Sequence, residues 1–243
     1  MEYEDQQPRL FDGDRWGRRP PPGLKSFLLI LNLQIDWILD NIYNATSAYR
    51  PIIFAEGETE IEKLTLALED RWYFGHSGID WRAVPRVLRQ IVTLKRVGGV
   101  STIEQQLVRT VLERRERTIN RKSRELVLAW ILSHRMSKRA ILRSYLDMAY
   151  FGYRLRGCDE VARILFAMNS PQLNKEQAAL VASLLVYPLP STVLLGVSYL
   201  YPISNIDEFL NSASVFAPKW AFRVRRRMKY GLSRIYQTKK SRN

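Results

Sequence analysis

Apolar residues recur at intervals of three and four along most of the chain, a spacing that places them on one face of a helix. Three such segments open at a residue pair that suits a helix N-terminus: Thr59 with Glu62, Ser101 with Glu104, and Asn174 with Gln177. In each pair the first side chain can accept a hydrogen bond from the backbone N–H of the second residue, three positions later. The second side chain can accept one from the backbone N–H of the first residue. Helices are therefore predicted to begin directly after residues 59, 101 and 174.

Further helices are predicted over residues 81–96, 121–137 and 137–152. Asp80 can cap the first, although Pro85 lies in or near its opening turn, and Ser137 can cap the last. No alternating apolar and polar pattern of useful length predicts a strand, and no internal repeat occurs. The fold class is therefore predicted to be mainly α.

Ser26–Leu39 is the apolar segment that most resembles a membrane element near the N-terminus. A spanning helix needs roughly 20 apolar residues, and polar residues interrupt this one at Asn32, Gln34 and Asp36. Arginines and a lysine precede it, at Arg15, Arg18, Arg19 and Lys25. Two interpretations stay open: a helix lying in the bilayer interface, with the cations meeting lipid headgroups, or a helix of the protein core.

A second long stretch, residues 177–205, carries no charged side chain. Pro188 and Pro190 stand in its middle, where they would break a spanning helix. A buried helix followed by a loop is predicted here.

Composition adds a strong basic bias. The 243 residues carry a net charge of +14, with a pI near 10.1. Such a charge indicates an anionic partner: nucleic acid, an anionic membrane face, or a phosphate-bearing substrate. The lone cysteine, Cys158, excludes an internal disulfide, and two histidines make a histidine-based zinc site improbable. The first 25 residues are charged and proline-rich, so no secretory signal is evident.

Candidate chemistry begins at "LEDRWYFGHSGID", residues 68–80, where Glu69 and Asp70 precede an aromatic cluster and His76. A carboxylate beside aromatic side chains is poorly hydrated, which suits general acid–base work, and Asp70 and His76 can tune it. The alternative is a solvated carboxylate at a helix end, and this segment alone favours that alternative.

A second segment, "GGVSTIEQQLVRT", runs from Gly98 to Thr110. Ser101 begins a helix whose free N–H groups favour an anion, and Gln105 and Arg109 lie four apart on one helical face. The segment lacks the Gly-Lys-Thr end of a nucleotide-binding P-loop. It suits a phosphate-bearing or sugar-bearing ligand, while an ordinary capped helix remains the alternative.

The third segment, "RKSRE", places Arg121 and Lys122 four and three residues before Glu125. Both cations can pair with Glu125 on one helical face. The simple alternative is a surface ion pair worth less than about 1 kcal/mol. The functional interpretation is a carboxylate held among cations that grip a pyrophosphate.

Taken together, these segments resemble the family-51 glycosyltransferases, the peptidoglycan polymerases also called transglycosylase domains of penicillin-binding proteins. "EDRWYFGHSG" resembles the first family motif, Glu-Asp-x-x-Phe-x-x-His-x-Gly, and "GVSTIEQQLVRT" the second. "RKSRE" resembles the third, "SKRAILRSYLDMAYFG" the fourth, and "NKEQAALVASLLVYPLPS" the Pro-ending segment that follows. The resemblance covers roughly residues 55–195, in order, and implies a lysozyme-like, two-lobed helical domain.

Three positions depart from the family pattern. Tyr73 replaces a phenylalanine, Arg109-Thr110 replaces Lys-Asn, and Asp147 replaces an asparagine. These changes leave open a divergent acceptor, weak activity, or a protein that binds without turnover. The chain is too short for a transpeptidase domain as well, so the monofunctional type is expected, with a weakened or missing N-terminal anchor.

The resemblance implies transfer of a lipid-linked glycan to lipid II with inversion, releasing undecaprenyl pyrophosphate. Glu69 would be the general base, and Glu125 would assist the leaving pyrophosphate directly or through a divalent cation, Mg²⁺ or Mn²⁺. The resemblance implies that the substrate-binding residues are Asp70, His76, Ser101, Gln105, Gln106, Arg109, Arg121 and Lys122. Asp70 and His76 would mainly shape the surroundings of Glu69.

These inferences divide the chain into a flexible basic tail (1–24), an interface helix (25–45), the transglycosylase domain (46–205) and a basic C-terminal extension (206–243). The extension is a membrane-surface or substrate-facing element, or else a solvated tail. The family implies the outer face of the bacterial inner membrane, with lipid II, an anionic membrane surface and cell-wall synthesis proteins as partners. A lysozyme-like glycan-cleaving enzyme and a silent lipid II-binding scaffold remain alternatives. A nucleic-acid binder is disfavoured, because the basic residues are dispersed.

Overall fold

The computed structural model describes residues 23–44, 50–83, 85, 89, 101–112 and 119–240. Its α-helices are α1 (Leu24–Asn44), α2 (Glu60–Glu69), α4 (Ile103–Val111), α5 (Ile119–Arg135), α6 (Lys138–Met148), α7 (Cys158–Phe166), α8 (Lys175–Leu184), α9 (Ser191–Gly196), α10 (Ile206–Phe216) and α11 (Pro218–Lys240). Two short strands, β1 (Tyr150–Gly152) and β2 (Leu155–Arg156), form an antiparallel hairpin. The mainly-α, lysozyme-like class predicted from the sequence is confirmed.

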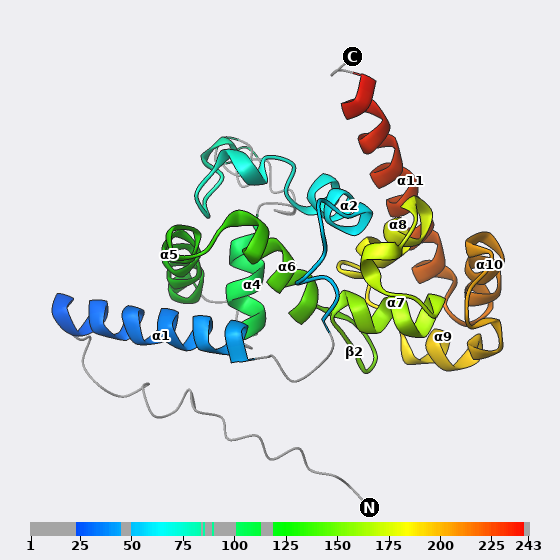
Figure 1. Ribbon diagram of the computed structural model, residues 1–243, viewed down its shortest axis with the longest axis horizontal. Helices are drawn as coiled ribbons and strands as arrows, with labels where there is room; N and C mark the ends of the chain where they lie inside the picture. The colour runs from blue at the N-terminus through cyan, green and yellow to red at the C-terminus, as the bar shows by residue number, and fades with distance from the viewer. Residues whose placement is uncertain are drawn as a thin grey trace, which may run out of the picture.

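The helices form two groups with a shared middle (Figure 1). On one side α1 and α5 pack with α4, and on the other α7, α9 and α10 lie with α8 and α11. Between the groups, α6 packs against α4 and α7, while α2 packs against α8 and α11. The two segments with candidate carboxylates therefore come from different parts of this arrangement, with α4 beside α5 and α2 beside α11.

Helix starts follow the predicted caps with one exception. Thr59 and Glu62 form a capping box at α2, and Asn174 and Gln177 form another at α8. Ser137 caps α6 by accepting from the Ala140 N–H. The box predicted for Ser101 and Glu104 is wrong.

At α4 the N-cap is Thr102, whose hydroxyl accepts from the Gln105 N–H. Glu104 is fully buried and contacts the Lys138 ammonium instead of bonding back to the cap. A buried carboxylate is stabilised more by an ion pair with a cation of another helix than by a hydrogen bond to the cap backbone N–H. A carboxylate charge without a counter-charge would be costly in the core. This tertiary contact moves the helix start by one residue.

Of the two interpretations left open for the N-terminal apolar segment, the packing of α1 supports the core helix. Leu31, Ile35, Ile38 and Ile42 are buried, and α1 contacts α4 and α5. Leu29, Leu33 and Tyr43 are exposed. Among the residues that the structure describes, no helix has the length and apolar character needed to cross a bilayer.

The uncharged stretch behaves as predicted, since α8 is buried along residues 178–184 and ends before Pro188. The β1–β2 hairpin was not predicted, because strands this short carry no alternating pattern. Gly152 in β1 lies against the backbone of Leu189, where an added Cβ would come within 2.5 Å of the Leu189 carbonyl oxygen. The hairpin thus fastens the loop after α8.

The C-terminal segment is helical and packed. Ala221, Val224 and Met228 of α11 are buried, and the helix lies against α2 and α8. The solvated-tail alternative is therefore wrong for this part of α11. A Cβ added to Gly231 would meet the Leu68 side chain at 3.2 Å. This close approach of α11 brings its basic residues to the end of α2.

Parts of other predictions lie outside the described residues: the tail 1–22, the glycine stretch 98–100, and most of the helix predicted over 81–96. At the start of that helix the structure has a 3₁₀ turn, Trp81–Ala83, and the Asp80 carboxylate accepts from the Arg82 N–H.

Candidate active site

Glu69 is the last residue of α2, and its carboxylate is held by two other helices. Its Oε1 accepts a hydrogen bond from the Arg227 guanidinium of α11. Its Oε2 accepts from the Gln106 Nε2 of α4, at 3.3 Å. The Glu69 side chain is only 10% exposed. The carboxylate is thus oriented by one strong ionic contact and one longer, weaker amide contact.

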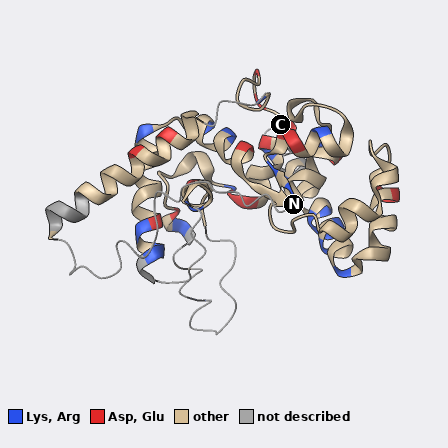
Figure 2. Ribbon diagram, turned by 90° about the horizontal axis from the view of Figure 1, so that it is seen from below, with Lys and Arg blue, Asp and Glu red and all other residues tan. Residues whose placement is uncertain are grey.

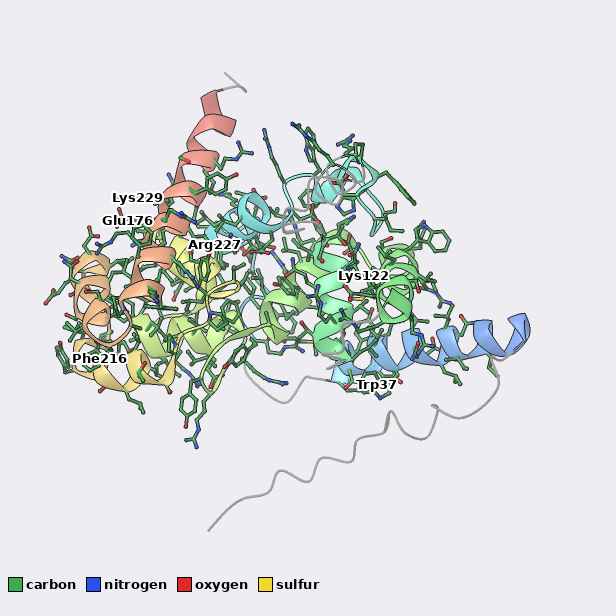
Figure 3. The ribbon with its side chains drawn as sticks, turned by 180° about the vertical axis from the view of Figure 1, so that it is seen from behind. Trp37, Lys122, Glu176, Phe216, Arg227 and Lys229 are labelled. Atoms are coloured by element: carbon green, nitrogen blue, oxygen red, sulfur yellow. The ribbon has the colours of Figure 1, made fainter. Side chains whose placement is uncertain are left out.

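Tyr145 of α6 fixes the orientation of the Gln106 amide. Its hydroxyl donates to Gln106 Oε1 at 2.6 Å, which turns Nε2 toward Glu69. Burial raises the pKa of the Tyr145 hydroxyl, and the negative charge of Glu69 raises it further. Tyr145 therefore stays a hydrogen-bond donor over the physiological pH range. Figure 3 shows Arg227 between α11 and α2, and its guanidinium contacts the Glu69 oxygen that Gln106 does not.

The aromatic cluster does not enclose Glu69 as the sequence suggested. Trp72 and Phe74 are more than half exposed. Tyr73 is buried and donates to the Lys138 carbonyl oxygen. The low exposure of Glu69 comes instead from its contacts with α4 and α11.

Asp70 and His76 lie together just behind Glu69. The His76 Nε2 lies 3.1 Å from both oxygens of the Asp70 carboxylate, and both side chains are nearly buried. Asp70 Oδ2 also accepts from the backbone N–H of Ile103, the first residue of α4. The pair therefore ties the end of α2 to the start of α4, which supports the positioning role expected for both residues.

Gly78, the last residue of the first motif, closes this corner. Its carbonyl oxygen accepts from the Thr102 hydroxyl at 2.9 Å and from Gln105 Nε2 at 3.0 Å. Its φ is +78°, and an added Cβ would lie 2.5 Å from the Ala129 carbonyl oxygen of α5. Only glycine fits this backbone conformation and close approach.

Glu125 of α5 is 4% exposed and paired with three cations. The Lys122 Nζ lies 3.0 Å from Oε1, Arg109 Nη2 lies 3.3 Å from Oε1, and Arg121 Nη1 lies 3.4 Å from Oε2. The predicted pairing within α5 is confirmed. The simple surface ion pair is excluded, because this carboxylate is buried under its partners.

The cations reach beyond Glu125 to the second motif. Lys122 Nζ donates to Gln105 Oε1 at 2.8 Å and to Ser101 Oγ at 3.4 Å. Glu125 and Arg121 also line a small opening with a volume of about 10 Å³, room for about one water molecule. Several N–H donors therefore surround a buried carboxylate that solvent-sized molecules can approach.

Helix α4 links the two carboxylates. Gln106, which contacts Glu69, and Arg109, which contacts Glu125, lie three residues apart and so share one helical face. The charges of Arg109 and Arg227 both oppose the effect of Glu69 on the pKa of Tyr145. Glu69 and Glu125 are thus both contacted from one face of α4.

The departures from the family pattern are accommodated locally. Asp147, in place of asparagine, pairs with the Arg50 guanidinium, and both side chains are largely buried. Thr110, in place of a second asparagine, donates its hydroxyl to the Gln106 carbonyl oxygen within α4. Arg109 keeps the positive charge of the usual lysine and forms an ion pair with Glu125.

The donor sets do not fit a divalent cation well. The Glu125 carboxylate is surrounded by three cationic side chains, and their positive charges repel an added cation. Within the described part of the chain, Asp70, His76 and Glu104 have donor atoms within 4.8 Å of one another. There, however, Lys138 already neutralises Glu104, and Asp70 already accepts N–H donors.

Sequence reasoning missed Arg227 as a contact of Glu69. Its motif neighbours gave no hint, because it lies in α11, far along the chain. A usable pattern was present in the apolar spacing of Ala221, Val224 and Met228, which marks one face of α11 as buried. That face indicates packing, and packing brings Arg227 to α2.

Residues 41–195 match the model of a family described as transglycosylase. A biosynthetic peptidoglycan transglycosylase of Alcanivorax borkumensis is 34% identical over 158 residues, which cover 65% of this chain and 59% of the relative. One of Acinetobacter baylyi is 30% identical over 180 residues, covering 74% and 77%. Penicillin-binding protein 2a of Streptococcus pneumoniae is 35% identical over 128 residues, covering 53% of this chain but 17% of that protein.

Proposed function

Because this chain belongs to the transglycosylase family, we propose that it is a peptidoglycan glycosyltransferase that polymerises lipid II into glycan strands. In the proposed reaction the hydroxyl of a lipid II acceptor attacks the anomeric carbon of a lipid-linked donor glycan. The bond to the pyrophosphate breaks, undecaprenyl pyrophosphate leaves, and the anomeric centre inverts. This assigns the chain to the inverting hexosyltransferases.

Glu69 is the proposed general base. Its carboxylate takes the proton from the acceptor hydroxyl as the new C–O bond forms. The observation that carries this assignment is the orientation of the carboxylate: Arg227 holds Oε1, while only a 3.3 Å amide contact occupies Oε2. A hydroxyl can replace so long a contact, so Oε2 is the oxygen that meets the acceptor.

The cations around Glu125 are the proposed site of the leaving pyrophosphate. Negative charge grows on the pyrophosphate oxygens as the bond breaks, and Arg109, Arg121 and Lys122 offset it. Glu125 keeps the three cations gathered on one face of α4 and α5. No step here passes through a divalent cation, in keeping with the donor sets.

The test is incubation of the purified chain with labelled lipid II, followed by electrophoresis of the products. We expect a ladder of glycan strands. Glu69→Gln should lower the rate by at least about 100-fold, since a positioned base contributes roughly that much. Glu176→Gln, at an exposed glutamate of α8 (Figure 3), is the matched control and should polymerise normally.

Two results would contradict the proposal. Wild-type rates from Glu69→Gln would remove Glu69 as the base. Binding of lipid II by the wild type without any ladder, with or without Mg²⁺ or Mn²⁺, would indicate the silent scaffold instead.

We also propose that the protein works on an anionic membrane surface, at the outer face of the inner membrane and beside other cell-wall synthesis proteins. Trp72, Phe74 and Trp81 are exposed, and the Arg82 guanidinium lies 4.6 Å from the Trp72 ring centroid. Aromatic and cationic side chains together suit a lipid headgroup layer. Among the described residues, Figure 2 shows Lys and Arg on several helices together with Asp and Glu, and this dispersion does not favour nucleic acid.

Flotation with vesicles tests the membrane proposal. Alanine at positions 72, 74 and 81 together should weaken binding to anionic vesicles, whereas Tyr199→Ala, at an exposed aromatic of the other helix group, should not. Equal binding by both variants would contradict it.

A further inference from the structure

Arg227 lies outside the region that matches the family model, residues 41–195, yet it makes the strongest contact of Glu69. Its Nη2 also lies 3.5 Å from the Leu68 carbonyl oxygen, near the end of α2. The Arg227 side chain is 18% exposed, so solvent screens this ion pair only in part. One cation thus binds both the candidate base and the helix end that carries it.

A guanidinium in this place orients a general base. Its charge-assisted hydrogen bond fixes one oxygen of the carboxylate. It also removes the freedom of a side chain that would otherwise sample several rotamers. Glu69 has no other cationic partner among its contacts in the described part of the chain.

The rest of the network depends on which oxygen is free. Tyr145 turns the Gln106 amide toward Oε2, and the Gln106 contact is long. If Arg227 did not hold Oε1, the carboxylate could rotate and offer either oxygen to Gln106. A fixed Oε1 therefore determines the oxygen available to the acceptor hydroxyl.

Resting on the proposed function, we propose that Arg227 is a positioning residue for the reaction: it anchors Oε1 of Glu69, so that Oε2 faces the acceptor. The residue acts through Glu69 and touches neither the donor nor the pyrophosphate. Its effect therefore falls on kcat and leaves the KM for lipid II unchanged.

The experiment measures kcat and KM for lipid II in the wild type and in Arg227→Ala, Arg227→Lys and Lys229→Ala. Arg227→Ala should lower kcat by at least about 10-fold with an unchanged KM, because a misplaced base loses much of its effect. Arg227→Lys restores the charge without the guanidinium fork, so it should recover part of kcat.

Lys229→Ala changes an exposed cation two positions along α11 (Figure 3) and should match the wild type. A wild-type kcat in Arg227→Ala would overturn the proposal. So would a loss that raises KM as much as it lowers kcat and that lysine does not restore, because that pattern indicates a structural role alone.

If the wild type makes no glycan, the proposed function fails, but the pair is still tested. NMR of the chain labelled with ¹³C at glutamate carboxyls observes Glu69 directly. A changed Glu69 signal in Arg227→Ala, with the Glu176 signal unchanged, supports the contact, and an unchanged Glu69 signal overturns it.

Discussion

Gly75 and Gly78 stand three residues apart in the same motif, and their surroundings differ completely. A Cβ on Gly75 would meet only the Arg82 Nη1, at 3.5 Å. A Cβ on Gly78 would meet the Ala129 carbonyl carbon and oxygen and the Trp130 nitrogen at 2.5–2.8 Å. The Gly78 backbone also has the positive φ that residues with a Cβ avoid. The motif therefore contains one glycine required by packing and one that is not.

We predict that Gly78→Ala lowers the free energy of unfolding by more than about 2 kcal/mol, through strain and collision with α5. It should also reduce polymerisation, because the Gly78 carbonyl holds Thr102 and Gln105. Gly75→Ala should stay within about 0.5 kcal/mol. Urea unfolding of the two variants measures this, and equal stability would contradict it.

The carboxylate of Asp147 finds its counter-charge in a residue that is distant in the sequence. The family pattern has an uncharged side chain here, and a buried negative charge without a partner would cost several kcal/mol. Arg50, 97 residues earlier in the chain, supplies the counter-charge. The negative charge that this substitution introduces is thus paired in the folded protein.

At the scale of the helices, α11 joins the C-terminal segment to the candidate site. Its buried residues lie on the face that meets α2 and α8, while Phe222 on another face is exposed. Detaching α11 would expose apolar surface on both neighbours and withdraw Arg227 from Glu69. Stability and activity should therefore fall together when this face is disrupted.

We predict that Val224→Asp, at a fully buried position, lowers the free energy of unfolding by about 3 kcal/mol or more. Polymerisation should also drop. Phe222→Asp, at an exposed position two residues earlier, should change neither by much. Thermal unfolding and the lipid II assay check both variants, and similar melting temperatures for the two would contradict the packing described for α11.

The helices were predictable where their ends depend on neighbours in the sequence. Thr59, Ser137 and Asn174 cap through residues three positions away, so the chain itself contains the information. Thr102 replaced Ser101 as a cap because Glu104 pairs with Lys138, in a helix 34 positions on. The cations of Glu125 were found because two of them share its helix. Arg227 was not, because its contact with Glu69 exists only once α11 has packed.

At the scale of the whole molecule, buried tyrosine hydroxyls and a buried cysteine thiol make the free energy of unfolding depend on pH in the alkaline range. Burial raises the pKa of the Tyr73 and Tyr145 hydroxyls and of the Cys158 thiol, and it raises the pKa of Tyr201 to about 12. Each group keeps its proton in the folded protein at a pH where the unfolded chain releases it. The free energy of unfolding therefore falls as the pH rises.

We predict full stability below about pH 8.5 and a decline above it, first from Cys158 and then, above about pH 10, from the tyrosines. Each group contributes about 1.4 kcal/mol per pH unit between its unfolded and folded pKa. Urea unfolding at pH 8, 9.5 and 11 measures the slope. Tyr201→Phe should make it shallower, and Tyr199→Phe, at an exposed position, should not. A flat profile would contradict the burial of these groups.

The approach of α11 to α2 also bears on how this enzyme family can be recombined. A chimera that grafted residues 41–195 of this chain onto the C-terminal helix of a relative would inherit Glu69 but not Arg227. Its motifs would be complete, yet the Glu69 carboxylate would lack a cationic partner unless the relative's helix supplied one. Domain exchange should therefore cut after Lys240 rather than after the last motif.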